Sequence, residues 1–216
     1  MTWVAWGVTT RASTRHRLAD SQDVTTPDWP LTTERLELRP VTPADADAFY
    51  AWRSLPEVAR YMFQPPWTPE LAARKLVDWS GAPFTMPGDV LVMAVTRRAS
   101  RDVIGEVLLK WAPGTGQVEV GYGFRPDVAG HGYATESVRA AVGLAFDVYG
   151  FHRVFARIDE ENTPSARVCE RLGMRLEARL VESDIRPDDG AWATELNYAM
   201  LAREHASGAA ASRRDP

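Results

Sequence analysis

The sequence predicts an α/β fold: one mixed, mostly antiparallel sheet of six to seven strands with helices on both faces. Three strand-like segments, residues 89–96, 103–111 and 117–124, are joined by short polar or glycine-containing turns, which predicts an antiparallel meander. The pattern then changes, because a long helical segment, 132–148, and another strand-like segment, 153–159, follow the meander. A strand, a helix and a strand in this order predict a parallel pair, which needs such a crossover.

The chain before the meander predicts one strand and three helical segments. Residues 36–40 alternate between leucine or proline and charged side chains, which is typical of a half-buried strand. Thr42 and Pro43 supply an N-cap and a proline at the first helical position, so a helix is expected next. Two further helical segments are expected at 56–62 and from the cap Thr68 onward. These helices should cover the sheet.

The chain after the crossover predicts one more helix and two strands. The helix is expected over residues 164–172 and should end at Gly173, because glycine favours the left-handed conformation of a helix C-cap. Strand-like segments at 174–183 and 192–201 should complete the sheet.

Length and local composition predict one domain, residues 31–203, between two tails. A chain of 216 residues can form one well-buried core, whereas two full domains would be crowded. Residues 1–30 show no sustained helical or strand periodicity and are expected to form a mobile extension. Residues 204–216 are expected to form a C-terminal tail, of which the small and polar residues 207–216 should add nothing to the core.

Composition argues against several classes of function. The net charge of −4 disfavours a broad nucleic-acid surface, and no apolar run approaches the roughly 20 residues of a membrane span. The single cysteine, Cys169, cannot form an internal disulfide, and no cluster of side chains has the spacing of a metal site. The first residues make a poor secretory signal, so a soluble, cytoplasmic protein is expected, without metal, membrane or nucleic-acid partners.

A glycine-containing stretch after the third strand of the meander predicts an anion-binding site. Gly130 and Gly132 open the long helix directly after residues 117–124. Such a junction presents free N–H groups and the positive end of a helix dipole at one place, and the missing Cβ atoms let a ligand approach the backbone closely. A pyrophosphate suits this position.

Four segments stand in an order and spacing that are fairly specific together: residues 119–126, 130–136, 153–157 and 162–174. They resemble the GNAT superfamily of acetyl-CoA-dependent N-acetyltransferases, and within it the ribosomal-protein alanine N-acetyltransferase branch. The resemblance covers roughly residues 31–203. It implies an acyltransferase that moves an acetyl group from acetyl-CoA, its cosubstrate, to a primary amine by direct attack in a ternary complex.

The resemblance also implies a cofactor site. The strand that ends at Phe124 should splay from the strand 153–159, and pantetheine should hydrogen-bond to the main chain exposed in this gap. Pyrophosphate should rest on the amides of the loop that follows. Ala129 stands where the family usually has Gln or Arg, so main-chain groups must carry most of the binding. The implied cofactor-binding residues are Tyr122, Gly123, Phe124, Ala129, Gly130, His131, Gly132, Tyr133, Ala134, Asn162 and Ser165.

The chemistry requires a base, because an alkylammonium group must lose a proton before it attacks a thioester. Glu119 is the first candidate, since it lies on the strand that leads into the gap and the resemblance often places the base there. A structural, ion-paired strand glutamate is the alternative. Asp184 is the second candidate and matches an acidic residue of the branch. It lies in a charged stretch, where a plain surface aspartate is the simpler interpretation.

The chemistry also requires a hydrogen bond or a proton for the departing thiolate. Many members of the superfamily use a tyrosine at the position of Cys169, so that acid is missing here, and Cys169 is expected to be a small buried apolar residue. Ser165, one helical turn earlier, fits a branch in which a serine faces the sulfur. Ser165 and Asn162 could equally serve as capping residues at the start of the helix.

The acceptor and the oligomeric state stay open. A protein N-terminus and a small molecule, such as an aminoglycoside or a polyamine, both fit a primary-amine acceptor, and both a monomer and a homodimer fit the sequence. Ala129 and Cys169 also motivate a different class, a non-catalytic acyl-CoA-binding module. Four aromatic residues are expected near the acceptor side of the gap, with core packing as their default role: Trp52, Tyr61, Phe63 and Trp67.

Overall fold

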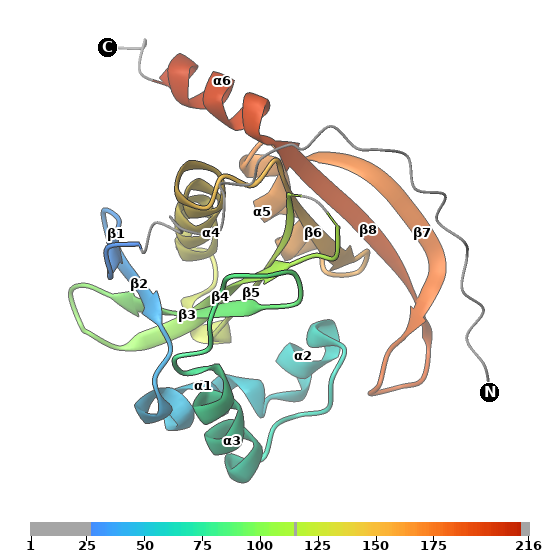
Figure 1. Cartoon of the computed structure of the whole chain (residues 1–216). Helices are drawn as coiled ribbons and strands as arrows, with labels where there is room; N and C mark the ends of the chain where they lie inside the picture. The colour runs from blue at the N-terminus through green and yellow to red at the C-terminus, as the bar shows by residue number, and fades with distance from the viewer. Residues whose placement is uncertain (1–26, 115, 213–216) are drawn as a thin grey trace.

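The computed structural model describes residues 27–114 and 116–212 and has one mixed sheet at its centre (Figure 1). Its strands are β1 (Leu31–Thr32), β2 (Leu36–Pro40), β3 (Val90–Arg97), β4 (Val103–Trp111), β5 (Gln117–Phe124), β6 (Arg153–Asp159), β7 (Arg175–Ile185) and β8 (Trp192–Leu201). They lie in the order β1-β2-β3-β4-β5-β6-β8-β7. Neighbours are antiparallel except β5 and β6, which are parallel. The mixed, mostly antiparallel α/β sheet is confirmed, and the short β1 brings it to eight strands.

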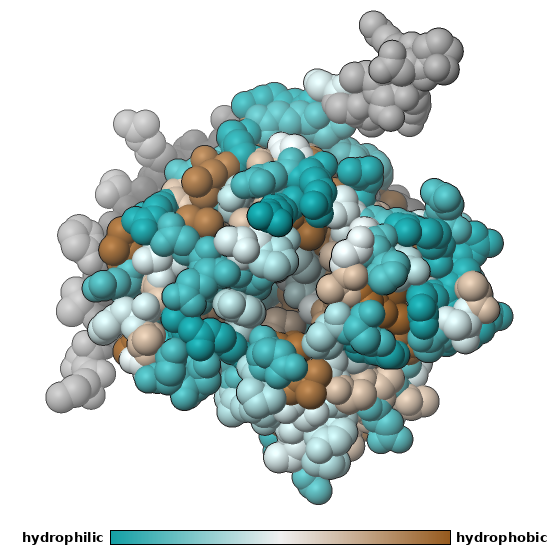
Figure 2. Space-filling view, turned by 180° about the vertical axis from the view of Figure 1, so that it is seen from behind, coloured by the Kyte–Doolittle hydropathy of each residue, from teal (hydrophilic) through white to brown (hydrophobic). Residues whose placement is uncertain are grey.

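Helices cover both faces of the sheet, as expected. They are η1 (Pro43–Asp45), α1 (Ala46–Arg53), α2 (Pro56–Ala59), η2 (Arg60–Met62), α3 (Pro69–Trp79), η3 (Pro126–Val128), α4 (Tyr133–Gly143), η4 (Leu144–Val148), α5 (Thr163–Arg171) and α6 (Ala202–Ser212). Helices α1 and α3 pack on one face, while α4 and α5 pack on the other. The apolar side chains gather in two interior clusters, and the face in Figure 2 is mostly hydrophilic with small, separate apolar patches.

The β5–α4–β6 crossover forms the parallel pair that the sequence predicts. Its helix is regular α-helix only to Gly143, and a π-helical turn then continues it to Val148. Strands β5 and β6 pair only at their beginnings, where Gln117–Glu119 lies beside Arg153–Phe155. Beyond Glu119 the two strands no longer pair. The main chain of the second half of β5 is therefore unpaired on its β6 side.

The first residues of the C-terminal tail, Glu204 and His205, contact the domain. Strand β8 leads directly into α6, and the side chain of Glu204 accepts a hydrogen bond from the amide of Leu201 at 2.8 Å. The ring of His205 stacks on Phe146, with 5.0 Å between the ring centroids. Residues 1–26 of the predicted extension lie outside the described residues.

A buried ion pair fastens α1 to the middle of the sheet. A guanidinium N–H of Arg53 donates to the carboxylate of Glu106 on β4, and these side chains are 3% and 0% exposed. The other carboxylate oxygen of Glu106 has no partner among the described residues. Arg53 also lies 4.9 Å above the ring of Trp67. Because Glu106 pairs with Gly123 across β4 and β5, the ion pair lies beside the half of β5 that is unpaired on its β6 side.

The Arg53→Met variant is expected to lose about 3–5 kcal/mol of unfolding free energy, because it leaves the Glu106 carboxylate buried without a counter-charge. Chemical denaturation of the purified variants measures this loss. The Arg53→Met/Glu106→Leu double variant should regain most of it, since an apolar pair needs no counter-charge. A double variant as unstable as the single variant would contradict this explanation.

Candidate active site

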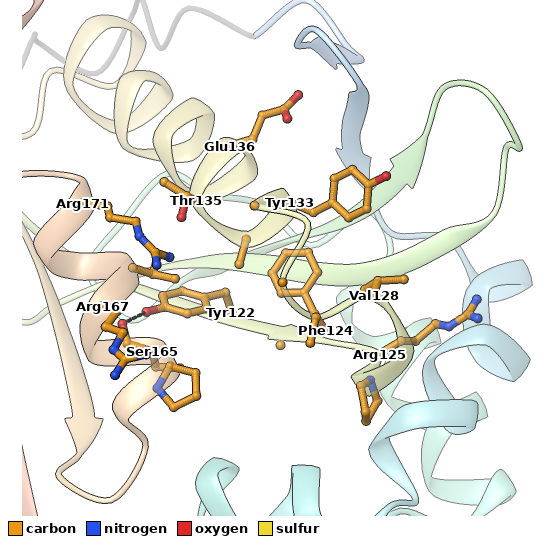
Figure 3. A pocket seen from close by; sticks show the side chains of 18 of the residues that line it. Tyr122, Phe124, Arg125, Val128, Tyr133, Thr135, Glu136, Ser165, Arg167 and Arg171 are labelled. Atoms are coloured by element: carbon orange, nitrogen blue, oxygen red, sulfur yellow. Dashed lines mark hydrogen bonds between the residues drawn. The ribbon is translucent and has the colours of Figure 1, made fainter.

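A cavity of about 1010 Å³ opens where β5 and β6 diverge. Its walls are the second half of β5, the loop before α4, one side each of α4 and α5, the turn between β1 and β2, and the α2–η2 segment (Figure 3). All of the predicted cofactor-binding residues line this cavity except His131. The His131 side chain is exposed and its Nδ1 lies 3.0 Å from the carbonyl oxygen of Ala129. The structure thus brings together two motifs that are separated by α4 and β6.

The loop before α4 has the conformation that its glycines favour. Gly130 and Gly132 have φ angles of 80° and 78°, in the left-handed region that other residues rarely adopt. Gly132 is the N-cap of α4, and no side chain caps the helix there. A Cβ atom added to Gly130 would meet no protein atom within 4 Å. The loop thus lies beside open space at Gly130, next to the start of α4 that no side chain caps, and this arrangement suits an anionic ligand.

The hydroxyl of Tyr122 is a feature of the cavity that sequence reasoning missed. Tyr122 lies on β5 and points toward α5, where its hydroxyl donates to the carbonyl oxygen of Ser165 at 2.9 Å and lies 3.6 Å from Cys169 Sγ (Figure 3). Burial raises the pKa of Tyr122 far above its ordinary value and raises the pKa of Cys169 to about 11. Both groups therefore stay protonated near neutral pH, and Cys169 is the buried apolar residue that the sequence predicts.

Strand periodicity could have indicated this hydroxyl. Val118, Val120 and Tyr122 alternate along β5, and the first two are buried on the face that α4 and α5 cover. The side chain of Asn162 accepts a hydrogen bond from the amide of Ser165 at 3.3 Å, so Asn162 caps α5. Both Asn162 and Ser165 also line the cavity.

Glu119 lies at the point where β5 and β6 separate, on the opposite face of β5 from Tyr122. Its carboxylate does not line the cavity. It accepts a hydrogen bond from Arg157 Nε on β6 at 3.1 Å, and the Glu119 side chain is 19% exposed. Glu119 is thus ion-paired, as the structural interpretation of this glutamate expects, and it lies at the edge of the gap between β5 and β6.

Two further carboxylates lie near Arg157. Glu195, on β8, is 3.6 Å from Arg157 Nη1, and Asp184, on β7, is exposed and outside the cavity. Burial raises the pKa of Glu195; Arg157 opposes this effect, while Glu119 and Asp184 add to it. Sequence reasoning missed Glu195, because only the pairing of β8 with β6 brings it to this place.

The four aromatic residues that were expected near the acceptor side of the gap do not all line the cavity. Trp52 and Trp67 are 0% and 4% exposed and pack in the core between α1, α3 and the sheet. Tyr61 lines the cavity beside Met62, whereas Phe63 ends η2 with a φ of 51°. Of these aromatic side chains, Tyr61 is therefore the one that lines the cavity.

Neither a metal site nor a membrane span is found in the part of the chain that the structure describes. No group of three His, Cys, Asp or Glu side chains there is arranged to hold a metal ion. None of the described helices has both the length and the apolar character that crossing a membrane requires.

Comparison with known proteins defines the chain as an acyltransferase. The model of the acetyltransferase (GNAT) domain matches residues 35–175, well over half of the chain, and the chain therefore belongs to the GNAT family. It is 28% identical to the uncharacterised N-acetyltransferase p20 of Bacillus licheniformis over 177 residues, which cover 82% of this chain and 98% of that protein. A crystal structure of a GNAT-family acetyltransferase from Bacillus anthracis matches with a TM-score of 0.73 and 27% identity, covering 81% of this chain and 99% of that one.

Two more distant solved structures share the fold. The spermidine N-acetyltransferase of Vibrio cholerae, in complex with CoA and spermine, matches with a TM-score of 0.67 and covers 81% of this chain and 99% of that one. The ribosomal-protein-S5-alanine acetyltransferase of Vibrio fischeri matches with a TM-score of 0.69, over 81% of this chain and 97% of that one. Because each is 19% identical to this chain, the likeness shows the fold alone.

Proposed function

We propose that the protein transfers an acetyl group from acetyl-CoA to a primary amine by direct attack within a ternary complex. The observation that carries this proposal is the meeting of the unpaired half of β5 with the glycine loop of α4 in one cavity. Pantetheine would hydrogen-bond to the main chain of residues 122–124 in the manner of an added strand. The pyrophosphate would accept hydrogen bonds from the amides of residues 129–134.

The carboxylates around Arg157, which come from β5, β7 and β8, would prepare the amine. Glu119 is at the edge of the gap and would remove a proton from the ammonium group, directly or through a water molecule. Arg157 holds this carboxylate in place. Glu195 has a raised pKa and would share the proton, while the exposed Asp184 would act at longer range on the approaching cation. The amine would therefore enter the gap between β5 and β6 from the side of these carboxylates.

The hydroxyls on the α5 side would assist the departure of sulfur. Attack by the amine forms the C–N bond, the nitrogen then releases its second proton to water, and breaking of the C–S bond leaves the electron pair on the sulfur. The Tyr122 hydroxyl would turn from the Ser165 carbonyl to donate a hydrogen bond to this thiolate, with the Ser165 hydroxyl as a second donor. Because burial raises the pKa of Tyr122, its proton stays on oxygen and the thiolate is stabilised by hydrogen bonding.

For the acceptor we favour a protein N-terminus, as in the ribosomal-protein alanine branch that the sequence resembles. The carboxylates around Arg157 are suited to any cationic amine, so a polyamine or an aminoglycoside is the second candidate. The distant structural neighbours include one enzyme named for each acceptor class, spermidine and a ribosomal-protein alanine. A non-catalytic acyl-CoA-binding module is the candidate from another class, motivated by Ala129 and Cys169.

Thiol release from acetyl-CoA, measured across a panel of N-terminal peptides, polyamines and aminoglycosides, tests the function. At least one amine should give CoA thiol and acetylated product in equal amounts. Tight binding of acetyl-CoA with no turnover across the whole panel would favour the binding module instead.

With an accepted amine, Glu119→Gln and Ser165→Ala should each slow thiol release, Glu119→Gln by about 100-fold because a positioned base contributes at least that much. Glu177→Gln is the matched control, because Glu177 is also a strand glutamate paired with an arginine, Arg153 at 2.6 Å, but at the end of β6 that is still paired with β5, away from the gap. The control should retain the wild-type rate. Unchanged turnover in both site variants would contradict the assigned roles.

A further inference from the structure

Three arginines on one wall of the cavity lack a counter-charge. Arg139 lies on α4, and Arg167 and Arg171 lie on α5. Among the described residues none of the three has a carboxylate at salt-bridge distance, and the polar contact found for them is from Arg139 Nη2 to the carbonyl oxygen of Arg171 at 3.4 Å. The three side chains are exposed. This wall therefore carries a positive charge that the described part of the protein does not neutralise.

Three arginines on the other side of the glycine loop are each paired with a carboxylate. Arg35 pairs with Glu136 at 2.6 Å, Arg97 pairs with Asp102 at 2.5 Å, and Arg101 pairs with a glutamate of β2 at 3.2 Å. Their charges are thus balanced within the fold. Arg98, in the same region, has no carboxylate at salt-bridge distance among the described residues and donates to the main-chain carbonyl oxygens of Thr33 and Glu34. The α4–α5 wall, with three such arginines, is therefore the larger uncompensated positive group beside the loop.

The placement of Arg167 and Arg171 favours an anion between them. They are four residues apart on α5, so they lie on the same side of the helix, where like charges repel. Figure 3 shows both side chains at the α5 side of the cavity, with Arg171 near Thr135 at the start of α4 and Arg167 near Ser165. A phosphate group bound there would remove the repulsion and accept charge-assisted hydrogen bonds from both guanidinium groups.

We propose that Arg139, Arg167 and Arg171 bind the 3′-phosphate of CoA and make the enzyme prefer CoA thioesters to those of 3′-dephospho-CoA. The inference rests on the proposed function, which places the pyrophosphate at Gly132. Arg139 is seven residues further along α4, about 10 Å along the helix axis, and its side chain leans back toward the N-terminus. The wall thus lies where the ribose that follows the pyrophosphate would present its phosphate.

The test compares the dissociation constants of CoA and 3′-dephospho-CoA by calorimetry at low salt, for the wild type and for the Arg139→Gln/Arg167→Gln/Arg171→Gln variant. The wild type should bind CoA about tenfold more tightly or better, a preference that shrinks as salt is added. The variant should lose this preference and still bind 3′-dephospho-CoA as the wild type does, which shows that its fold and its pyrophosphate site are intact. Arg74→Gln, at an exposed arginine of α3 outside the cavity, should keep the preference.

Equal affinity of the wild type for both ligands would overturn the assignment of the 3′-phosphate while leaving the proposed function in place. A full preference for CoA in the triple variant would overturn it as well. Failure of the wild type to bind either ligand would instead overturn the proposed function, and the inference with it.

Discussion

The Gly130→Val variant is expected to bind acetyl-CoA at least about 100-fold more weakly than the wild type, as measured by calorimetry. Gly130 has a φ of 80°, which strains a β-branched residue, and its missing Cβ faces open space in the cavity. The added side chain would meet the ligand and displace the pyrophosphate from the amides around it. Each lost hydrogen bond to a charged group is worth about 1.5–3 kcal/mol, and 100-fold corresponds to about 2.7 kcal/mol.

The Gly190→Val variant separates the effect on the ligand from the effect on the backbone. Gly190 lies in the turn between β7 and β8 and has a φ of 69°, and a Cβ atom added there would also meet no protein atom within 4 Å. It carries the same kind of strain but lies outside the cavity. We expect it to lose stability and to bind acetyl-CoA normally. Equal weakening of binding in both variants would show that the glycine loop has no special role.

The Tyr122→Phe variant is expected to turn over acetyl-CoA about 100-fold more slowly, with little change in its affinity for acetyl-CoA. In the proposed function, the removed hydroxyl is the donor that would meet the sulfur only as negative charge develops on it, and loss of one such donor typically lowers kcat by about 100- to 1000-fold. Because burial raises the pKa of Tyr122 far above its ordinary value, the hydroxyl stays protonated. The defect should therefore be the same at each pH from about 6 to 9 in steady-state rates.

Tyr149→Phe is the matched control for this loss. Burial also raises the pKa of Tyr149, to about 12, and its ring packs edge-on against Phe84 with 5.0 Å between the centroids. Tyr149 does not line the cavity, so its variant should retain the wild-type turnover. Wild-type turnover in Tyr122→Phe would leave Ser165 as the thiolate partner on this wall.

Much of the fold could be predicted because its signals are local. Alternation over 117–124 and 153–159, with a long helical segment between, is enough to predict the parallel crossover. Strand β1 was missed because two residues, Leu31–Thr32, are too few to show alternation. Helix α6 was missed because the composition of the tail gives no apolar period, whereas His205 reaches Phe146 only after β8 has placed it there.

The conformation of the glycine loop could be predicted for the same reason, and the grouping of carboxylates around Arg157 could not. The glycine loop is one continuous segment whose conformation follows from its own residues. The carboxylates around Arg157 come from three strands, β5, β8 and β7, so their proximity depends on strand order and register. Tyr122 meets Cys169 across 47 positions of sequence, and nothing local to either residue indicates the contact.

The most direct test of the proposed site is a crystal structure of the protein with CoA. We expect the pyrophosphate within hydrogen-bond distance of the main-chain amides between Ala129 and Ala134, the pantetheine along the unpaired half of β5, and the sulfur beside the hydroxyls of Tyr122 and Ser165. CoA bound outside this cavity, or with its sulfur away from the gap between β5 and β6, would contradict the proposal.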